Sequence, residues 1–323
     1  MPDAVLRVII ASMKRSIKLI LRLIVSAVLL VVLFYRVDLK QLLNTMLRVG
    51  VGNFLELSAL YLLSQVVSSI RWSMVIRSLG ARMGVVRLLL AYLLGMFANL
   101  FLPSTIGGDA IKAYVVSKVL GLRLAVSSIF LERYNGLVAL LLISLASVFI
   151  FKGFFDVRLK MLVVGVVIFA MFAPFLLGLR YFRRFKRLDN FFMDIMRFHK
   201  SSLILPVTLL SFLVQGIVIL VYVLASRMLG FDVPAAYFLA FIPIINLISF
   251  LPISFNGVGV REFSFVYFFS LAGLNRVDAL SLSLLVFFVV VFCSLVGGAV
   301  YLVWKDNVVK EAERFYREES ADT

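Results

Sequence analysis

The chain has 323 residues, of which 63% are hydrophobic and 15% are charged, with a net charge of +16. A soluble protein is about 45–50% apolar and about 25% charged, so the composition excludes a soluble chain and predicts an all-α polytopic membrane protein. Basic residues collect in cytoplasmic loops, and we therefore expect no nucleic acid as a partner. The single Cys293 and single His199 argue against a disulfide framework, a metal site or a Ser/His/Asp centre. We expect no cofactor and no catalytic residues.

The apolar segments fall into two classes by length. A helix of about 20 apolar residues crosses about 30 Å of hydrocarbon. The stretches 88–103 and 235–252 are shorter, stop at proline, and are followed by glycines and a second short apolar helix. Each predicts a re-entrant broken-helix hairpin. About six stretches are long enough to cross fully, and they cover residues 17–35, 54–70, 127–151, 161–179, 202–225 and 279–304.

The basic residues predict which ends of these segments face the cytoplasm. With a cytoplasmic N-terminus, 23 Lys and Arg residues fall on the inner side and 9 on the outer side, while Arg133 lies within a span. This asymmetry predicts that both termini are cytoplasmic. A hairpin that crossed the membrane twice would leave the count unchanged, so the charges leave open whether the hairpins are re-entrant.

The two hairpins share a sequence motif. Residues 102–114 read LPSTIGGDAIKAY and residues 251–263 read LPISFNGVGVREF, an offset of 149 residues without a gap. Each lies in a half with the order span, span, hairpin, span, and the halves cover residues 17–151 and 161–304. Three crossings per half is an odd number, so the pattern predicts an inverted repeat. Such repeats with matching broken helices are typical of transporters with a site near the midplane.

The first hairpin carries four candidate substrate-binding residues. Gly107 and Gly108 permit positive φ and a close approach of a ligand or backbone, and Asp109 stands where a helix N-cap is expected. A helix beginning there would direct its free N–H groups at an anion such as a lipid phosphate, and Lys112 would add charge. The alternative is that the glycines only break the helix, Asp109 only caps it, and Lys112 only extends to the interface.

The second hairpin provides four further candidates. Asn256 and Gly257 occupy the turn, Arg261 takes the position of the lysine, and Glu262 follows it. The same alternative applies here, since an arginine near a membrane surface can simply extend towards the headgroups.

Glu132 and Arg133 are the remaining candidates, near the start of a predicted span. An ionisable residue at membrane depth is costly and usually has a partner. Adjacent residues point about 100° apart on a helix, so we expect the partners to lie on other segments: Arg133 with Asp109, or Glu132 with Lys112 or Arg261. The alternative is that both residues are merely interfacial.

Two surface segments complete the predicted organisation, in which residues 1–304 form a single membrane domain. Residues 180–200 intersperse aromatic and aliphatic residues with Arg and Lys, which predicts a basic amphipathic helix on an anionic membrane surface. Residues 305–323 are expected to form a cytoplasmic tail.

Several strings resemble a known family: RWSMVIRSLG, NLFLPSTIGGDAIKAYVVSK, ERYNG and LPISFNGVGVREFSFVYFFSLAGL. They resemble the transmembrane region of lysylphosphatidylglycerol synthases and its stand-alone YbhN-like and AglD-like relatives, over nearly the whole chain. The resemblance implies a flippase-like protein of a prokaryotic plasma membrane. In the two-part synthases aminoacyl transfer belongs to another membrane segment and a soluble domain. The 323 residues do not contain that domain, so we expect no aminoacyl transfer by this chain.

The resulting hypothesis is a lipid transporter. Lys112 and Arg261 would neutralise the phosphate of an anionic or polyprenyl-linked lipid, and Asp109 and Glu132 would pair with them or with a cationic headgroup. One alternative is a membrane-embedded transferase for a lipid-linked substrate, with Asp109 or Glu132 as base. Another is an accessory scaffold that partners a lipid-biosynthesis enzyme. The lipid, the direction, the coupling ion and the oligomeric state are left open.

Overall fold

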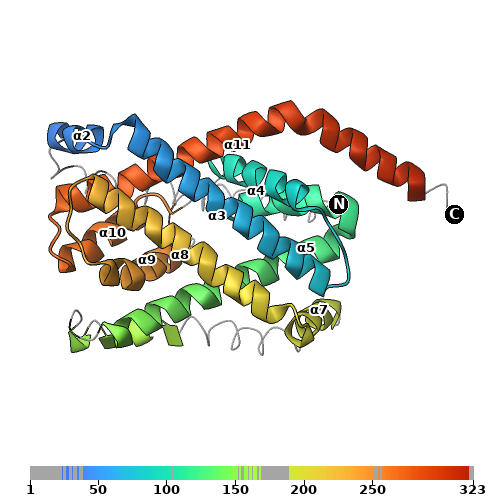
Figure 1. The fold of residues 1–323 in the computed structure, drawn as a ribbon, viewed down its shortest axis with the longest axis horizontal. Helices are drawn as coiled ribbons and strands as arrows, with labels where there is room; N and C mark the ends of the chain where they lie inside the picture. The colour runs from blue at the N-terminus through green and yellow to red at the C-terminus, as the bar shows by residue number, and fades with distance from the viewer. Residues whose placement is uncertain are drawn as a thin grey trace, which may run out of the picture.

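The described part of the structure is built from helices. The computed structural model describes residues 39–102, 105–151, 189–249 and 257–319, with Ser254 and scattered positions within 24–35 and 153–168. Every regular element in these ranges is a helix, which confirms the predicted all-α class. The predicted spans 17–35 and 161–179 lie largely outside the described residues. The helices are α2 (Leu39–Leu47), α3 (Gly50–Ser78), α4 (Val85–Asn99), α5 (Thr105–Ile150), α7 (Asp189–Lys200), α8 (Ile204–Met228), α9 (Ala235–Ser249), α10 (Val260–Leu271) and α11 (Arg276–Glu319) (Figure 1).

Four helices are long and apolar enough to cross a membrane. They correspond to four of the six predicted full spans, and the other two fall in the largely undescribed ranges. The four candidate spans are Gly50–Ser78, Gly107–Ile150, Ile204–Met228 and Arg276–Val303. Two of the helices that contain them, α3 and α8, lie side by side and run in opposite directions, with the end of α3 next to the start of α8 (Figure 1).

The helices α4 and α9 are the first limbs of the two predicted hairpins. Each has 15 residues, which makes it about 22 Å long at 1.5 Å per residue. That is shorter than the hydrocarbon core of about 30 Å. α4 packs against the beginning of α5, and α9 packs against α10. Both limbs are thus shorter than the candidate spans, and the re-entrant path of the hairpins stays a prediction.

The same turn precedes each of these short helices. Gly80 (φ 88°) and Gly230 (φ 81°), which are 150 residues apart, follow the ends of α3 and α8 in the left-handed conformation. The next residue in each case, Ala81 or Phe231, donates its N–H back to a carbonyl oxygen of the preceding helix at 3.2 or 2.9 Å. This is the Schellman arrangement that glycine favours. The repeat therefore extends beyond the shared motif, although the two-fold inversion of whole halves stays a prediction.

Each hairpin packs against the last span of the other half. α4 lies on α11, where a Cβ atom on Gly297 would come within 2.8 Å of the Leu93 carbonyl oxygen. α9 lies on α5, where the Ser144 hydroxyl donates to the Ala240 carbonyl oxygen at 3.0 Å. Small residues allow this close packing between membrane helices. The two halves are consequently interlocked.

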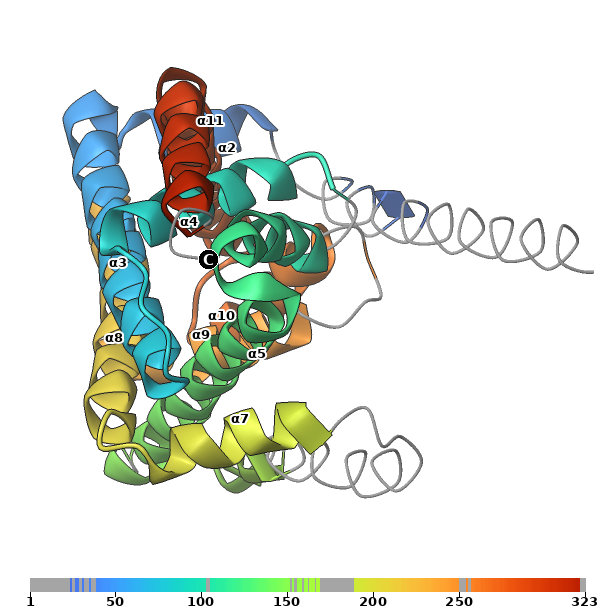
Figure 2. The same ribbon diagram turned by 90° about the vertical axis from the view of Figure 1, so that its right-hand side faces the viewer.

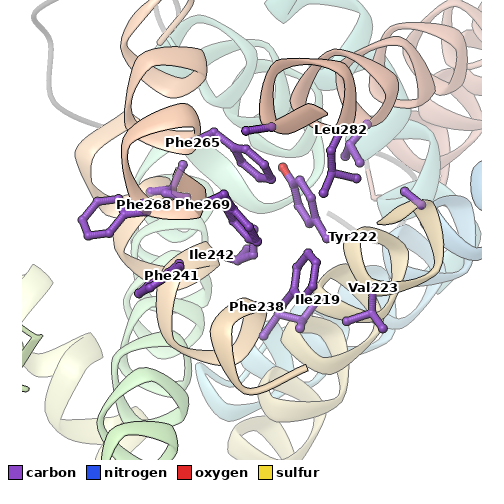
Figure 3. Packing of buried hydrophobic residues seen from close by; sticks show 14 of the residues in the cluster. Ile219, Tyr222, Val223, Phe238, Phe241, Ile242, Phe265, Phe268, Phe269 and Leu282 are labelled. Carbon is purple, nitrogen blue, oxygen red and sulfur yellow. The ribbon is translucent and has the colours of Figure 1, made fainter. Parts of the chain in front are cut away.

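Aromatic side chains fill the interior of the second half. Figure 3 shows rings from α9 and α10 facing Tyr222 of α8. The Phe265 and Phe269 rings stack with centroids 4.2 Å apart, and the Phe238 ring lies 4.9 Å from that of Phe269. All three phenylalanines are fully buried. This interior is held by dispersion and ring contacts.

The helix α7 docks on the end of the bundle formed by α3, α5 and α8 (Figure 2). Phe198 is buried against Val75 and Leu79 of the α3 end. Asp194 is also buried, and it accepts hydrogen bonds from Ser127 at 2.8 Å and from Arg123 at 3.3 Å. The described part of the predicted amphipathic segment is therefore bound to the bundle. Residues 180–188 of that segment lie outside the described residues.

In the predicted tail, 305–323, the helix α11 continues to Glu319.

Candidate functional site

A kink in α5 creates the centre of the site. Gly121 has φ 76° and ψ 157°, a conformation that is essentially restricted to glycine, and it divides α5 into two limbs. Asp109 and Arg133 are each twelve residues from Gly121, on opposite limbs. The Nη2 atom of Arg133 donates to Oδ1 of Asp109 at 2.7 Å, and its Nε atom faces Oδ2. The predicted Arg133–Asp109 pair is present in the structure and joins the two limbs.

Glu132 connects three helices. Its Oε1 atom accepts hydrogen bonds from the Arg71 guanidinium of α3 and from the Tyr92 hydroxyl of α4. The Lys112 Nζ atom lies 3.8 Å from Oε2 of Glu132 and 3.8 Å from Oδ1 of Asp109. Of the two basic residues in the hairpin motifs, Lys112 is the one that contacts Glu132, and Arg261 does not.

The Lys112 ammonium is also enclosed by aromatic rings. Its Nζ atom lies 3.6 Å from the ring centroid of Tyr92 and 4.7 Å from that of Trp72. Cation–π attraction is strongest where water is excluded, and Lys112 is 4% exposed. The Trp72 ring is held in place because its Nε1 donates to the Ser128 hydroxyl at 3.1 Å.

Arg71 is a site residue that the sequence patterns did not identify, because it directly follows the predicted span 54–70. The helix continues seven residues beyond it, to Ser78. The absence of any Gly or Pro before Gly80 was the signal that the helix goes on. Its Nη1 atom donates to Ser211 of α8 at 3.1 Å, and a Cβ atom on Gly136 would come within 3.2 Å of the same Nη1 atom. No described residue accepts a hydrogen bond from the buried Nε atom.

Five residues, Arg71, Asp109, Lys112, Glu132 and Arg133, form one group that we call the charged cluster. Three are cations and two are carboxylates, so the formal charge of the cluster is +1. The side chains of Arg71, Lys112 and Glu132 are only 6%, 5% and 3% exposed. Buried charge is costly unless it is compensated. Among the described residues, no group of three or more His, Cys, Asp or Glu is placed to hold a metal ion.

The comparison with known families bears on this region directly. Residues 19–297 match the family described as the lysylphosphatidylglycerol synthase TM region. The chain belongs to this family. The match includes both hairpins and all of the charged cluster. A comparison with curated proteins found no significant match. The resemblance seen in the sequence is therefore confirmed.

In this lysylphosphatidylglycerol synthase TM region, the prediction that Asp109 is a helix N-cap is wrong. α5 begins at Thr105, so Asp109 lies within the helix, and its carboxylate is occupied by basic side chains. The neighbouring Gly108 N–H is not free either, because it donates to Oδ1 of Asn99 at 2.8 Å. A free helix N-terminus directed at an anion is therefore not found at Asp109.

The two glycines before Asp109 serve close packing. A Cβ atom on Gly108 would lie 2.4 Å from the Gly95 carbonyl oxygen of α4, and one on Gly107 would lie 2.6 Å from the Leu102 Cβ atom. Neither glycine has a positive φ. They do not form a turn. Gly108 lets α4 and α5 approach until Lys112 reaches Tyr92, and Gly107 makes room for the Leu102 side chain.

The second hairpin of the family fold has a different arrangement. Gly257 has φ 78° and Gly259 has φ 83°, immediately before α10, while Asn256 lies outside the described residues. Glu262 accepts from the Gly259 N–H at 2.7 Å and from the Nε atom of Arg261 at 3.0 Å. Arg261 also stacks over the Phe287 ring at 4.9 Å.

Arg261 is therefore paired within its own hairpin. α10 packs against α9 and α11, and no hydrogen bond or ion pair in the described part of the chain connects Arg261 to the charged cluster. The structure brings together Gly107, Gly108, Asp109, Lys112, Glu132 and Arg133, and it places Gly257, Arg261 and Glu262 in a second group.

Proposed function

We propose that the chain is a flippase-type lipid transporter in which the charged cluster binds the phosphate of an anionic or lipid-linked headgroup. The observation that carries this proposal is the +1 formal charge of the cluster, which is also the formal charge of its buried part, Arg71, Lys112 and Glu132. An uncompensated charge at membrane depth is expensive. A phosphate entering the cluster would supply the missing negative charge.

Arg71 supports the proposal by its geometry. A guanidinium presents a planar fork of N–H donors that suits phosphate. Glu132 and Ser211 take the Nη atoms, while the buried Nε–H has no acceptor among the described residues. A ligand oxygen at Nε would complete the hydrogen bonding of this side chain.

The kink at Gly121 offers a way for binding to change the conformation. The pair Arg133–Asp109 and the contact Lys112–Glu132 both join the two limbs of α5. A phosphate that competes with Asp109 and Glu132 for these cations would weaken the connection and favour separation of the limbs. A ligand shifts a conformational equilibrium by its differential affinity for the two states.

The contacts of the two carboxylates favour a binding role over the transferase alternative. Asp109 faces two basic side chains, and Glu132 faces Arg71, Lys112 and the Tyr92 hydroxyl. A general base needs a free lone pair within reach of the proton it removes. These lone pairs are engaged by donors of the protein itself.

The test uses the full chain in vesicles with fluorescent phosphatidylglycerol, in which a membrane-impermeant quencher reports translocation. We expect Arg71→Met/Lys112→Met to slow translocation at least about tenfold, since each charged contact contributes about 1.5–3 kcal/mol. The matched control, Arg227→Gln/Arg276→Gln, removes two exposed arginines and should remain within about twofold. Equal rates for the native chain and the cluster variant would refute the proposed site.

Mass spectrometry of the lipids from the same vesicles separates transport from the alternatives. A relocated but chemically unchanged lipid supports the transporter. A modified lipid supports the transferase. No activity in vesicles, with activity restored by a co-purified enzyme, supports the scaffold.

A further inference from the structure

The turn between α3 and α4 contains a hollow that is separate from the charged cluster. Its volume is about 460 Å³, and it is lined by Arg77, Gly80, Ala81 and Arg82. Both arginines are exposed. They flank the Gly80 turn and line the same open space, which is large enough for a phosphate group and its first substituent.

A third guanidinium reaches this turn from α7. The Nη1 atom of Arg197 donates to the Leu79 carbonyl oxygen at 3.0 Å and passes close to Gly80. The end of α3 lies near α7 (Figure 2), so residues far apart in the sequence bring positive charge to the same turn. The docking of α7 through buried Phe198 holds Arg197 there.

These positive charges have no carboxylate partner in the described structure. No described residue forms an ion pair with Arg77 or Arg82, and Asp194 of α7 is directed into the bundle, where Ser127 and Arg123 bind it. Three arginines gathered around one turn without a counter-charge favour an anionic ligand.

The second half provides an internal comparison for this turn. Arg227 stands one turn before Gly230, as Arg77 stands before Gly80, and the backbone turn is the same. A basic residue at the end of a helix is explained by the helix dipole at both places. The residue at the position of Arg82 is Asp232 in the second half. The dipole therefore accounts for Arg77 but not for the additional charge of Arg82 and Arg197.

We propose that the α3–α4 turn is a second anion site, which binds the phosphate of an anionic lipid headgroup through Arg77 and Arg82 with Arg197 beside it. The turn directly follows a helix long enough to cross a membrane, so it lies at the depth of the headgroups. A phosphate bound here would connect α7 to the start of the first hairpin. The site does not depend on transport and stands or falls separately from the charged cluster.

Hydrogen exchange measured by mass spectrometry tests the site locally. The full chain in neutral mixed micelles is titrated with phosphatidylglycerol, with phosphatidylcholine as a zwitterionic comparison, and peptides covering 77–84 and 189–200 are followed. We expect phosphatidylglycerol to slow exchange in both peptides. In Arg77→Gln/Arg82→Gln the half-saturating concentration should rise about 25-fold, from about fivefold per arginine. In Arg227→Gln/Arg276→Gln, with the same change of charge, it should stay within about twofold.

The outcomes are distinct. An equal loss of protection in both double variants would show a general charge effect and overturn the site, and so would an unchanged titration in Arg77→Gln/Arg82→Gln. A second arm adds inorganic phosphate without lipid. Protection of the same peptides by phosphate, with none by phosphatidylglycerol, would overturn the lipid as source. The thermal unfolding temperature of each variant shows whether it is folded. We expect little change, because the replaced arginines are exposed and make few packing contacts.

Discussion

The two hairpins have similar frames and different interiors. α4 and α9 have the same length and follow the same glycine turn. In the first half, Arg71, Tyr92 and Asp109 belong to a polar network. The residues 150, 150 and 149 positions further on are Val221, Ile242 and Val258. The second interior is instead filled by phenylalanine rings (Figure 3).

This difference bears on why the first half contains buried charges. The second hairpin forms a limb of the same length, and its described ion pair, Arg261–Glu262, lies within α10 and joins no other helix. An ionic network between helices is therefore not needed to build the hairpin. Replacing a buried ion pair by apolar side chains is often neutral or stabilising, and the second half is an example of such an apolar solution. A cluster that costs stability and is not required by the fold is best explained by function.

The largest expected effect comes from Glu132→Gln, which breaks the cluster at its centre. The change leaves Arg71, Lys112 and Arg133 with one carboxylate and raises the formal charge of the cluster from +1 to +2. Removing one partner of a buried pair costs about 3–5 kcal/mol, and we expect a loss of this size in the free energy of unfolding measured by denaturant titration in micelles.

The matched control for Glu132→Gln is a variant that changes the charge of the cluster in the opposite direction. Arg71→Met removes a cation instead, so it leaves two cations with two carboxylates and should cost less than Glu132→Gln. If Arg71→Met proved the more destabilising of the two, the cluster would not carry an excess positive charge, and the basis of the proposed function would be lost.

The next effect concerns the close packing that brings the cluster together. In Gly108→Ala the new Cβ atom would meet the Gly95 carbonyl oxygen at 2.4 Å, and overpacking typically costs about 1–3 kcal/mol. Separation of α4 from α5 should also weaken the Lys112 contact with Tyr92 and slow lipid translocation. Gly216→Ala is the control, since nothing lies within 4 Å of its Cβ position. An alanine there should be neutral or stabilise α8 by up to about 1 kcal/mol. Equal effects of the two changes would contradict the packing role of Gly108.

Much of the fold could be predicted from the sequence because its signals are local. Runs of apolar residues determine spans, and prolines and glycines mark the broken segments. The pairing of Arg133 with Asp109 was also predictable, since a charge at membrane depth requires a partner. Both residues belong to α5, whose kink at Gly121 brings them opposite each other.

The remaining features depend on contacts between segments that are far apart in the chain. A Gly-Gly pair such as Gly107-Gly108 is typical of a turn, yet Gly108 is needed for a different reason: the Gly95 carbonyl oxygen of α4 lies too close for a side chain. Arg71 follows an apolar run in the sequence, as a loop residue would. Only the fold shows that Glu132 and Ser211 accept its hydrogen bonds. Asp194 on a predicted surface helix is buried for the same reason.

A smaller effect is expected for Asp194→Ala, which tests the α7 contact that has no described equivalent in the second half. Ser127 would lose its partner, while Arg123 remains solvated because its side chain is 52% exposed. Loss of one buried hydrogen bond costs about 1–2 kcal/mol, and we expect faster hydrogen exchange in residues 189–200. The control is Asp232→Ala, an exposed carboxylate, which should stay within about 0.5 kcal/mol. Unchanged exchange in α7 would show that Asp194 does not hold the helix.

The smallest effect is expected for Glu262→Gln, the same chemical change as Glu132→Gln made in the second half. A glutamine oxygen can still accept the Gly259 N–H, because glutamine also serves in a capping box. Arg261 is 20% exposed and lies over the Phe287 ring, so it can turn towards the interface when its carboxylate is lost. We therefore expect less than about 1 kcal/mol in the free energy of unfolding and little change in translocation. A cost equal to that of Glu132→Gln would mean that both halves contain an obligatory buried charge, and the functional asymmetry between the hairpins would have to be abandoned.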